Sequence, residues 1–325
     1  MPPIDPAPAP APAPAPATAP TEDELNERAR LVVEKLSSDP WICPVCQHVN
    51  KPIDNLLFKI PAFKCTNPTR NCNAKCPGTV AWSISDCILN AVRTHFPIRS
   101  QGKHPTCTAH AILAGMDAAL RIEGALRGKH VCQPLNDVDL LRKYCLSIPD
   151  GLGHEAEQRM KGLRFINLLW IAQAMGVEFV SPPGKRARRV LKLEYWFQLR
   201  IRTTSVDYLI RLIANGFPLI ATMETGRCFR MVTEGELYRG PKIAKNHAVL
   251  LHGTVVRQML LPNETTGQNE LVQKVLFKAR NSHGDKAHSS GAKAGLGGDV
   301  YILVEDLGPV VYGFRIEVPT WMVAA

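Results

Sequence analysis

The chain has 325 residues, of which 45% are hydrophobic and 21% charged, and its formal net charge is +10. This composition is typical of a soluble globular protein, and the length is sufficient for a two-lobed domain of about 230 residues with a smaller unit beside it. No apolar run reaches the ~18 to 20 residues that a transmembrane helix needs, so we predict no membrane span and no membrane partner. The positive charge permits an acidic partner without identifying one.

The location can be inferred from the first residues and from the cysteines. The sequence begins Met-Pro-Pro-Ile-Asp, and no basic or apolar region of a signal peptide follows. We therefore expect a cytoplasmic or nuclear protein, in a reducing compartment where the ten cysteines are thiols and metal ligands rather than disulfides. A basic run at 185–189 is interpreted as a surface loop, with a nuclear-import signal as the alternative.

Two segments precede the folded part. Residues 1–21 repeat Ala and Pro, and proline cannot enter the interior of a helix or a sheet, so we predict a disordered, extended tail. Thr21 and Glu24 have the spacing of a capping box, and apolar residues then recur at helical intervals. This pattern predicts a short helix over 22–38.

Residues 39–82 form a predicted cysteine-rich module that holds five of the ten cysteines. Cys43 and Cys46 are spaced to place two thiolates on one turn, as tetrahedral zinc requires, and Cys65, Cys72 and Cys76 offer a second pair with one to spare. Few apolar residues lie between them, so metal binding would supply much of the folding energy. We therefore predict a structural zinc ion, with unliganded thiols as the alternative.

The first part of this module, Trp41 to Asn50, resembles a zinc finger of the nucleoporin type. The second half departs from that spacing, so a generic zinc ribbon describes the segment equally well. The module could bind a ubiquitin-like protein or RNA, or it could contact only the neighbouring lobe.

Residues 86–325 are predicted to form one α+β domain, because helical patterns come first and strand patterns follow. Such an order places a site between a helical lobe and an antiparallel sheet lobe. The predicted helices span 107–126, 137–146, 155–175 and 206–215. The predicted strands span 219–223, 248–256, 271–279, 300–305 and 310–318.

Three residues of this domain have the chemistry of a thiol nucleophile and its base. Cys107 follows Pro105 and Thr106 at the predicted start of a helix, where the helix dipole favours a thiolate. His247 opens a predicted strand, and Asn281 ends another. A nucleophilic thiol needs a base, and the imidazole needs a third group that fixes its tautomer. Each residue alone would more readily be structural; their order and spacing favour catalysis.

The domain resembles the papain-like cysteine peptidases. Gln101 precedes Cys107 at the family's spacing, and further similar stretches lie in the same order along 92–325. The resemblance implies a two-lobed fold and an endopeptidase that acts on peptide or protein substrates without a catalytic cofactor. It implies Cys107 as nucleophile, His247 as its proton partner, Asn281 as the orienting group and Gln101 as an oxyanion donor. The other similar stretches are Pro134 to Cys145, Leu237 to Gly240, Asn281-Ser282 and Gly298 to Ile302.

The chain also departs from the family around this site. Thr108 and His283 replace two tryptophans, and the family's second tryptophan shields the Asn–His hydrogen bond, so we expect a wetter and weaker bond between Asn281 and His247. A catalytically silent papain-like scaffold that binds partners through the zinc-like module is therefore the alternative function. A third reading makes the zinc-like module the functional part and the rest an accessory.

Overall fold

The protein is described by a computed structural model over residues 40–54, 56–60, 62–70, 72, 74, 76, 80–147, 163–180, 189–226, 229, 232, 237–238, 246–262, 267–284, 287–288 and 298–323. The predicted tail (1–21), the predicted helix (22–38) and residues 185–188 of the basic run at 185–189 lie outside these residues. The described part combines helices with a large antiparallel sheet, which confirms the predicted α+β class.

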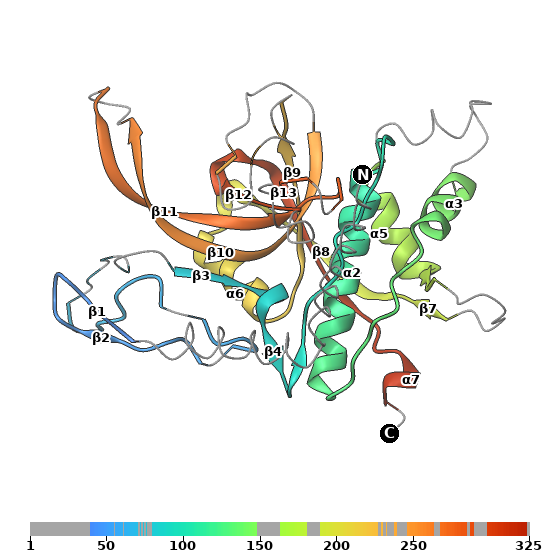
Figure 1. Ribbon diagram of the computed structural model, residues 1–325, viewed down its shortest axis with the longest axis horizontal. Helices are drawn as coiled ribbons and strands as arrows, with labels where there is room; N and C mark the ends of the chain where they lie inside the picture. The colour runs from blue at the N-terminus through green and yellow to red at the C-terminus, as the bar shows by residue number, and fades with distance from the viewer. Residues whose placement is uncertain are drawn as a thin grey trace, which may run out of the picture.

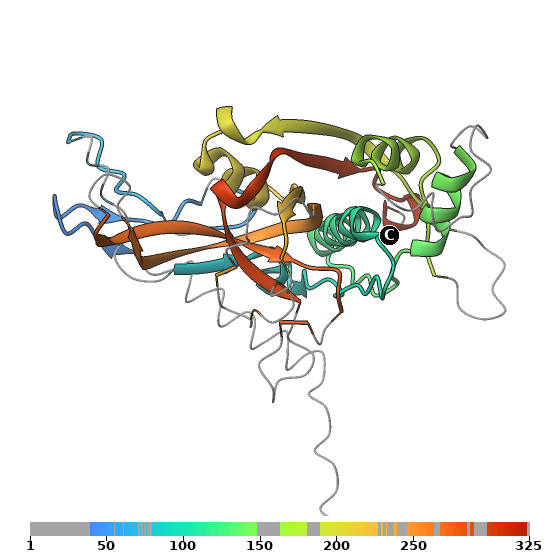
Figure 2. The same ribbon diagram turned by 90° about the horizontal axis from the view of Figure 1, so that it is seen from above.

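Helices α2 (Cys107–Leu126), α3 (Asp137–Ser147) and α5 (Phe165–Ala174) lie together on one side of the molecule (Figure 1). Most side chains of α2 are buried, because this helix packs against β9, β10 and β13 of the sheet on one side and against α3 and α5 on the other. The view along α2 shows it between the two groups (Figure 2). This arrangement places the first residue of α2 where the helical and sheet parts meet.

The sheet has seven strands in the order β12-β11-β10-β9-β13-β8, and β3 pairs with β10 beyond the end of β9. Every pairing is antiparallel. The register of β10 against β11 shifts between Leu251 and Gly253. Gly253 is required there, because a Cβ atom would lie 2.3 Å from the Trp82 carbonyl oxygen. The strands are β3 (Val80–Ser83), β8 (Leu193–Arg200), β9 (Leu219–Glu224), β10 (Asn246–Pro262), β11 (Asn269–Arg280), β12 (Asp299–Leu303) and β13 (Leu307–Ile316).

Short elements complete the described chain. Helix α6 (Val206–Ala214) contacts β10, and Ser205 caps it by accepting a hydrogen bond from the Tyr208 backbone N–H. The remaining pairs and short helices are β1 (Trp41–Ile42) with β2 (Val49–Asn50), β4 (Ile88–Leu89) with β5 (Val92–Arg93), β6 (Val177–Glu178) with β7 (Val190–Leu191), the 3-10 helices η1 (Ile84–Asp86), η2 (Ile201–Thr203) and η4 (Val304–Asp306), and α7 (Thr320–Val323).

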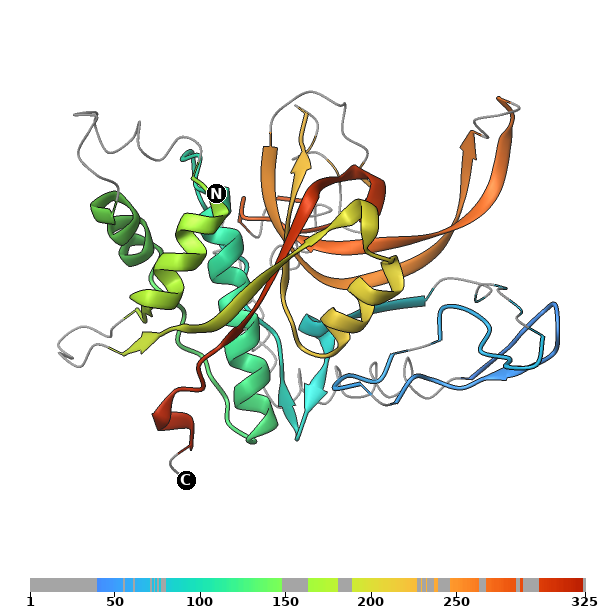
Figure 3. The same cartoon turned by 180° about the vertical axis from the view of Figure 1, so that it is seen from behind.

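The cysteine-rich segment joins the domain through its inner half. Phe58, Ile60 and Phe63 are buried in the same hydrophobic core as α2 and the sheet. The Phe58 N–H donates to the Ala214 carbonyl at 2.9 Å, at the end of α6. Seen from behind, the segment runs beside α6 and β3 (Figure 3). The cysteine-rich segment therefore packs against the α+β domain through these residues.

The helices over 107–126, 137–146 and 206–215 agree with prediction to within a residue at each end. Of the predicted helix over 155–175, residues Phe165–Ala174 are helical, and residues 155–162 lie outside the described part. Strand β8 is not predicted, because Tyr195, Trp196 and Phe197 are consecutive aromatics without alternation. Its pairing with β13 at the sheet edge makes it a strand.

Two further observations concern the whole described part. None of its helices combines the length and the apolar character that crossing a membrane would take. Its nine cysteines form no disulfide with one another.

Candidate active site and metal site

Cys107 is the first residue of α2 and is half-buried. The first N–H groups of a helix have no partner inside the helix. Thr106 precedes α2 as its N-cap, but its side chain makes no capping hydrogen bond. Cys107 therefore lies at the positive end of the dipole of a long helix.

His247 and Asn281 form a direct hydrogen bond between two neighbouring strands. His247 lies in β10, Asn281 directly follows β11, and the His247 Nε2 to Asn281 Oδ1 distance is 2.7 Å. Only 6% of His247 and 2% of Asn281 are exposed. The expectation of a wetter bond is therefore wrong, since the pair lies in a buried site where a hydrogen bond is stronger than in water.

Two aromatic rings lie against His247. His283 stacks on His247 with a centroid distance of 4.8 Å and an interplanar angle of 6°. The buried ring of Phe229 lies 5.3 Å from His247 and 6.0 Å from His283. The rings of His283 and Phe229 therefore cover the imidazole of His247.

The hydrogen bonds of Asn281 fix the proton positions on His247. The backbone N–H of Ser282 can only donate, and it lies 2.7 Å from Asn281 Oδ1. This atom is therefore an acceptor, so His247 Nε2 carries the proton that it donates to Asn281. In neutral His247, the Nδ1 nitrogen then holds the lone pair, as a general base requires.

Gln101 is tied to the same segment. Its backbone N–H donates to the Ser282 carbonyl at 2.7 Å, and the Ser282 hydroxyl donates to Gln101 Oε1 at 2.5 Å. One N–H of Gln101 Nε2 donates to the His104 carbonyl at 2.7 Å. The structure thus links Gln101, Asn281 and His247 by hydrogen bonds, and Cys107 follows Gln101 closely along the chain.

A buried ion pair between Arg280 and Asp299 lies directly beside Asn281 in the chain. Arg280 Nε lies 2.8 Å and Nη2 3.0 Å from the two carboxylate oxygens of Asp299, and Arg280 Nη1 donates to the Phe96 carbonyl at 2.7 Å. Burial alone would raise the pKa of Asp299, but Arg280 and His252 hold it well below its usual range. The Asn281 N–H also donates to the Gly298 carbonyl at 2.7 Å. Asn281 is therefore held on both its backbone and its side chain.

Two residues of this site are not predicted from the sequence. Phe229 lies in a stretch without periodicity, and His288 lies between Gly284 and Gly298, where the chain departs from the papain-like pattern. His288 Nε2 is 2.7 Å from Asn281 Nδ2. Only the tertiary contacts identify these residues.

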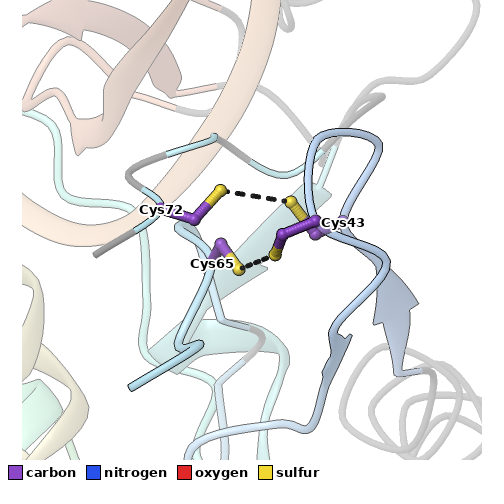
Figure 4. A group of neighbouring side chains, drawn as sticks. Cys43, Cys65 and Cys72 are labelled. Carbon is purple, nitrogen blue, oxygen red and sulfur yellow. Dashed lines mark hydrogen bonds between the residues drawn. The ribbon is translucent and has the colours of Figure 1, made fainter. Parts of the chain in front are cut away.

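Four of the five predicted metal ligands come together in the cysteine-rich module (Figure 4). The sulfur atoms of Cys43, Cys46, Cys65 and Cys72 all lie within 4.8 Å of one another. The Cys43–Cys72 and Cys46–Cys65 sulfur distances are 3.6 and 3.4 Å. Ligands at the ~2.3 Å Zn–S distance of a tetrahedral site are about 3.8 Å apart, so the cluster has the size and donor set of a zinc site. Cys76 is outside this group.

The thiols of Cys46 and Cys65 differ in their pKa without a cation. Burial and the neighbouring sulfurs raise the pKa of Cys65 to about 11. Burial also opposes ionisation of Cys46, but hydrogen bonds from the Asn67 side chain and the His48 backbone lower its pKa to about 6. A divalent cation would remove this competition, because zinc binds thiolates and displaces their protons.

No protein-family model and no curated protein matches the chain. Among solved structures, it is similar to xylellain, a cysteine protease from Xylella fastidiosa, with 16% identity, a TM-score of 0.43 and coverage of 68% of this chain and 82% of that one. It is also similar to the clostridial cysteine protease Cwp84, with 13% identity, a TM-score of 0.49 and coverage of 70% and 56%.

A third similar structure is procathepsin L2 from Tenebrio molitor larval midgut, with 18% identity, a TM-score of 0.45 and coverage of 68% of this chain and 65% of that one. Each of the three TM-scores lies below 0.5. Likeness at this level does not establish a function for this protein.

Proposed function

We propose that this protein is a cysteine peptidase with Cys107 as nucleophile, His247 as acid and base, and Asn281 as the residue that orients His247. The main support for this proposal is the buried 2.7 Å hydrogen bond between His247 Nε2 and Asn281 Oδ1. This bond leaves the other imidazole nitrogen as the base, and α2, which begins with Cys107, packs against β10, which carries His247.

The reaction we infer begins with the Cys107 thiolate, whose proton has passed to His247 Nδ1. The sulfur attacks the carbonyl carbon of a peptide bond, and the negative charge moves to the carbonyl oxygen. His247 then gives its proton to the leaving amine as the C–N bond breaks, and a thioester remains on Cys107. Water, deprotonated by His247, hydrolyses the thioester and regenerates the thiol.

The oxyanion would be stabilised by two N–H donors. One is the Cys107 backbone N–H at the start of α2. The other is the second N–H of Gln101 Nε2, since only one of its two protons is used by the His104 carbonyl. The loss of one such donor typically slows a reaction of this kind by about 100- to 1,000-fold. Substrates would be peptides or proteins, and endopeptidase cleavage stays a prediction.

We propose that Cys43, Cys46, Cys65 and Cys72 hold a zinc ion. When bound, the ion would cross-link the Cys43–Cys46 pair to Cys65 and Cys72 and supply stability, not catalysis. Its ligand set fits because four sulfur donors lie within 4.8 Å of one another. A ubiquitin-like or RNA partner for the module stays a prediction.

Covalent labelling tests the peptidase proposal. Purified protein would be treated with a peptidyl epoxide under reducing conditions and analysed by intact mass and peptide mapping, beside Cys107→Ala and the exposed-thiol control Cys132→Ala. We expect one label per chain, lost in Cys107→Ala and kept in Cys132→Ala. A well-folded protein that takes no label at Cys107 would contradict the proposal and support the silent scaffold.

A further inference from the structure

The hydrogen-bond chain of the site continues past Asn281 to His288. Asn281 Nδ2 lies 2.7 Å from His288 Nε2, and His288 Nδ1 lies 2.7 Å from the Val232 carbonyl oxygen. Only 2% of His288 is exposed. A series of three hydrogen bonds therefore connects His247, Asn281, His288 and the Val232 carbonyl. Each of these hydrogen bonds has one donor and one acceptor.

The direction of every proton in this chain can be assigned. Asn281 Oδ1 accepts from the Ser282 N–H, so Asn281 Nδ2 can only donate. His288 Nε2 must then be an acceptor, and its Nδ1 must carry the proton that the Val232 carbonyl accepts. His288 is thus neutral and in the Nδ1–H tautomer, and His247 is in the Nε2–H tautomer.

The surroundings of His288 favour this neutral form. The Phe229 ring is 5.0 Å away in an edge-on orientation. Burial lowers the pKa of His288, although the Val232 carbonyl and the Asp299 carboxylate act to raise it. Asp299 is itself paired with Arg280, and His247 is the titratable group at the other end of the chain. A proton on His288 Nε2 would face the Asn281 amide hydrogens and break the link.

We propose that His288 is a positioning residue of the active site, which holds the Asn281 amide in the orientation that fixes the His247 tautomer. This inference rests on the proposed peptidase function and adds a residue to it. Without His288, Asn281 Nδ2 would be a buried donor without its acceptor, and rotation of the amide would relieve that cost at the expense of the bond to His247.

His288 also closes the loop that follows Asn281. His288 has a φ of 65°, in the left-handed region, where His is more frequent than most residues. The neighbouring Ala287 carbonyl accepts from the Gly298 N–H at 2.7 Å, and Gly298 in turn accepts from Asn281. The backbone therefore holds the ring of His288 against the amide that it contacts.

The test uses full-length protein labelled with nitrogen-15 at histidine. Long-range proton–nitrogen correlation spectra report the tautomer of each histidine, and iodoacetamide alkylation at pH 6, mapped to Cys107, reports activation of the thiol. Two variants are compared with the parent. His288→Phe keeps a ring but accepts no hydrogen bond, whereas His288→Gln retains a side-chain oxygen that can accept from Asn281.

We expect the Nδ1–H tautomer at His288 and the Nε2–H tautomer at His247 in the parent protein. His288→Phe should give a mixed tautomer at His247 and slow Cys107 alkylation by about tenfold, since one hydrogen bond is lost. His288→Gln should stay within about threefold of the parent. Alkylation of Cys132 should be unchanged in both variants.

Either of two results would overturn the inference. One is an Nε2–H tautomer at His288 in the parent, which is decisive even if His288→Phe does not fold. The other is a folded His288→Phe with unchanged His247 tautomer and unchanged Cys107 alkylation. If Cys107 of the parent reacts no faster than Cys132, the proposed peptidase fails instead, and the tautomers still decide the role of His288.

Discussion

The four-cysteine cluster and the His247–Asn281–His288 cluster differ in burial and in what holds them together. The four-cysteine cluster lies near exposed apolar residues, with Val45 71% and Ile42 58% exposed. The hydrogen-bonded side chains of His247, Asn281 and His288 are buried in the core, and a buried Arg280–Asp299 ion pair supports them. One cluster depends on a metal for cohesion, and the other on packing and hydrogen bonds. Perturbations of the two should therefore have separable effects.

The largest effect on stability should come from breaking the buried Arg280–Asp299 ion pair beside Asn281. Asp299→Ala leaves the Arg280 guanidinium buried without its partner, and such a change destabilises a protein by about 3 to 5 kcal/mol. We expect a large fall in the denaturant midpoint of unfolding. The matched control is Asp207→Ala, which removes the exposed Lys64–Asp207 pair on the cysteine-rich side and should cost at most about 1 kcal/mol. If Asp299→Ala and Asp207→Ala lowered the free energy of unfolding equally, the two regions would not differ in how they are stabilised.

The helical side of the site adds a pH dependence. His110 is 3% exposed, and burial lowers its pKa to about 4 although Asp137 acts to raise it. The unfolded chain takes up this proton near pH 6.5, whereas the folded protein does so only near the lowered value. Stability is therefore unaffected above pH 6.5 and falls as the pH drops towards 4, by about 3 kcal/mol in full.

Thermal melts of the parent and His110→Gln from pH 7 to pH 4 check this sign. The variant should lose stability less steeply in that window. The exposed His130→Gln should follow the parent. A parent that becomes more stable on acidification would contradict the assignment.

Removal of the orienting amide should affect chemistry more than folding. Asn281→Ala deletes the acceptor of His247 and the donor to His288, and we expect Cys107 alkylation at pH 6 to slow by about 100-fold, as two hydrogen bonds are lost. Asn67→Ala, which deletes the hydrogen bond to Cys46 Sγ in the cysteine cluster, is the control. Its alkylation rate at Cys107 should equal that of the parent, and a shared decrease would mean that the two clusters are coupled.

Metal removal should have the smallest effect on the catalytic site. We expect elemental analysis to find one zinc ion per chain, lost in Cys46→Ser and kept in Cys76→Ser, because Cys76 lies outside the four-sulfur group. Proteolytic cleavage within residues 40–76 should accelerate without the metal. Cys107 alkylation should change by at most about twofold, since sites without shared partners act independently. Absence of zinc from purified parent protein would contradict the metal site.

The sequence by itself determined the helix that Cys107 begins, the strands that carry His247 and precede Asn281, and the Cys43–Cys46 pair. Each of these depends on local signals: capping residues, periodicity and short spacing. The role of each catalytic residue stays a prediction, because a role belongs to a reaction and not to a pattern.

Only the tertiary structure decided how these parts meet. It selected Cys72 over Cys76 for the sulfur cluster, added β8 to the sheet edge, and brought Phe229, His283 and His288 around the His247–Asn281 bond. It also showed that this bond is buried, contrary to the expectation of a wetter bond. These contacts join residues far apart in the chain, and no local pattern encodes them, because burial and hydrogen-bond partners are set only when strands and helices pack.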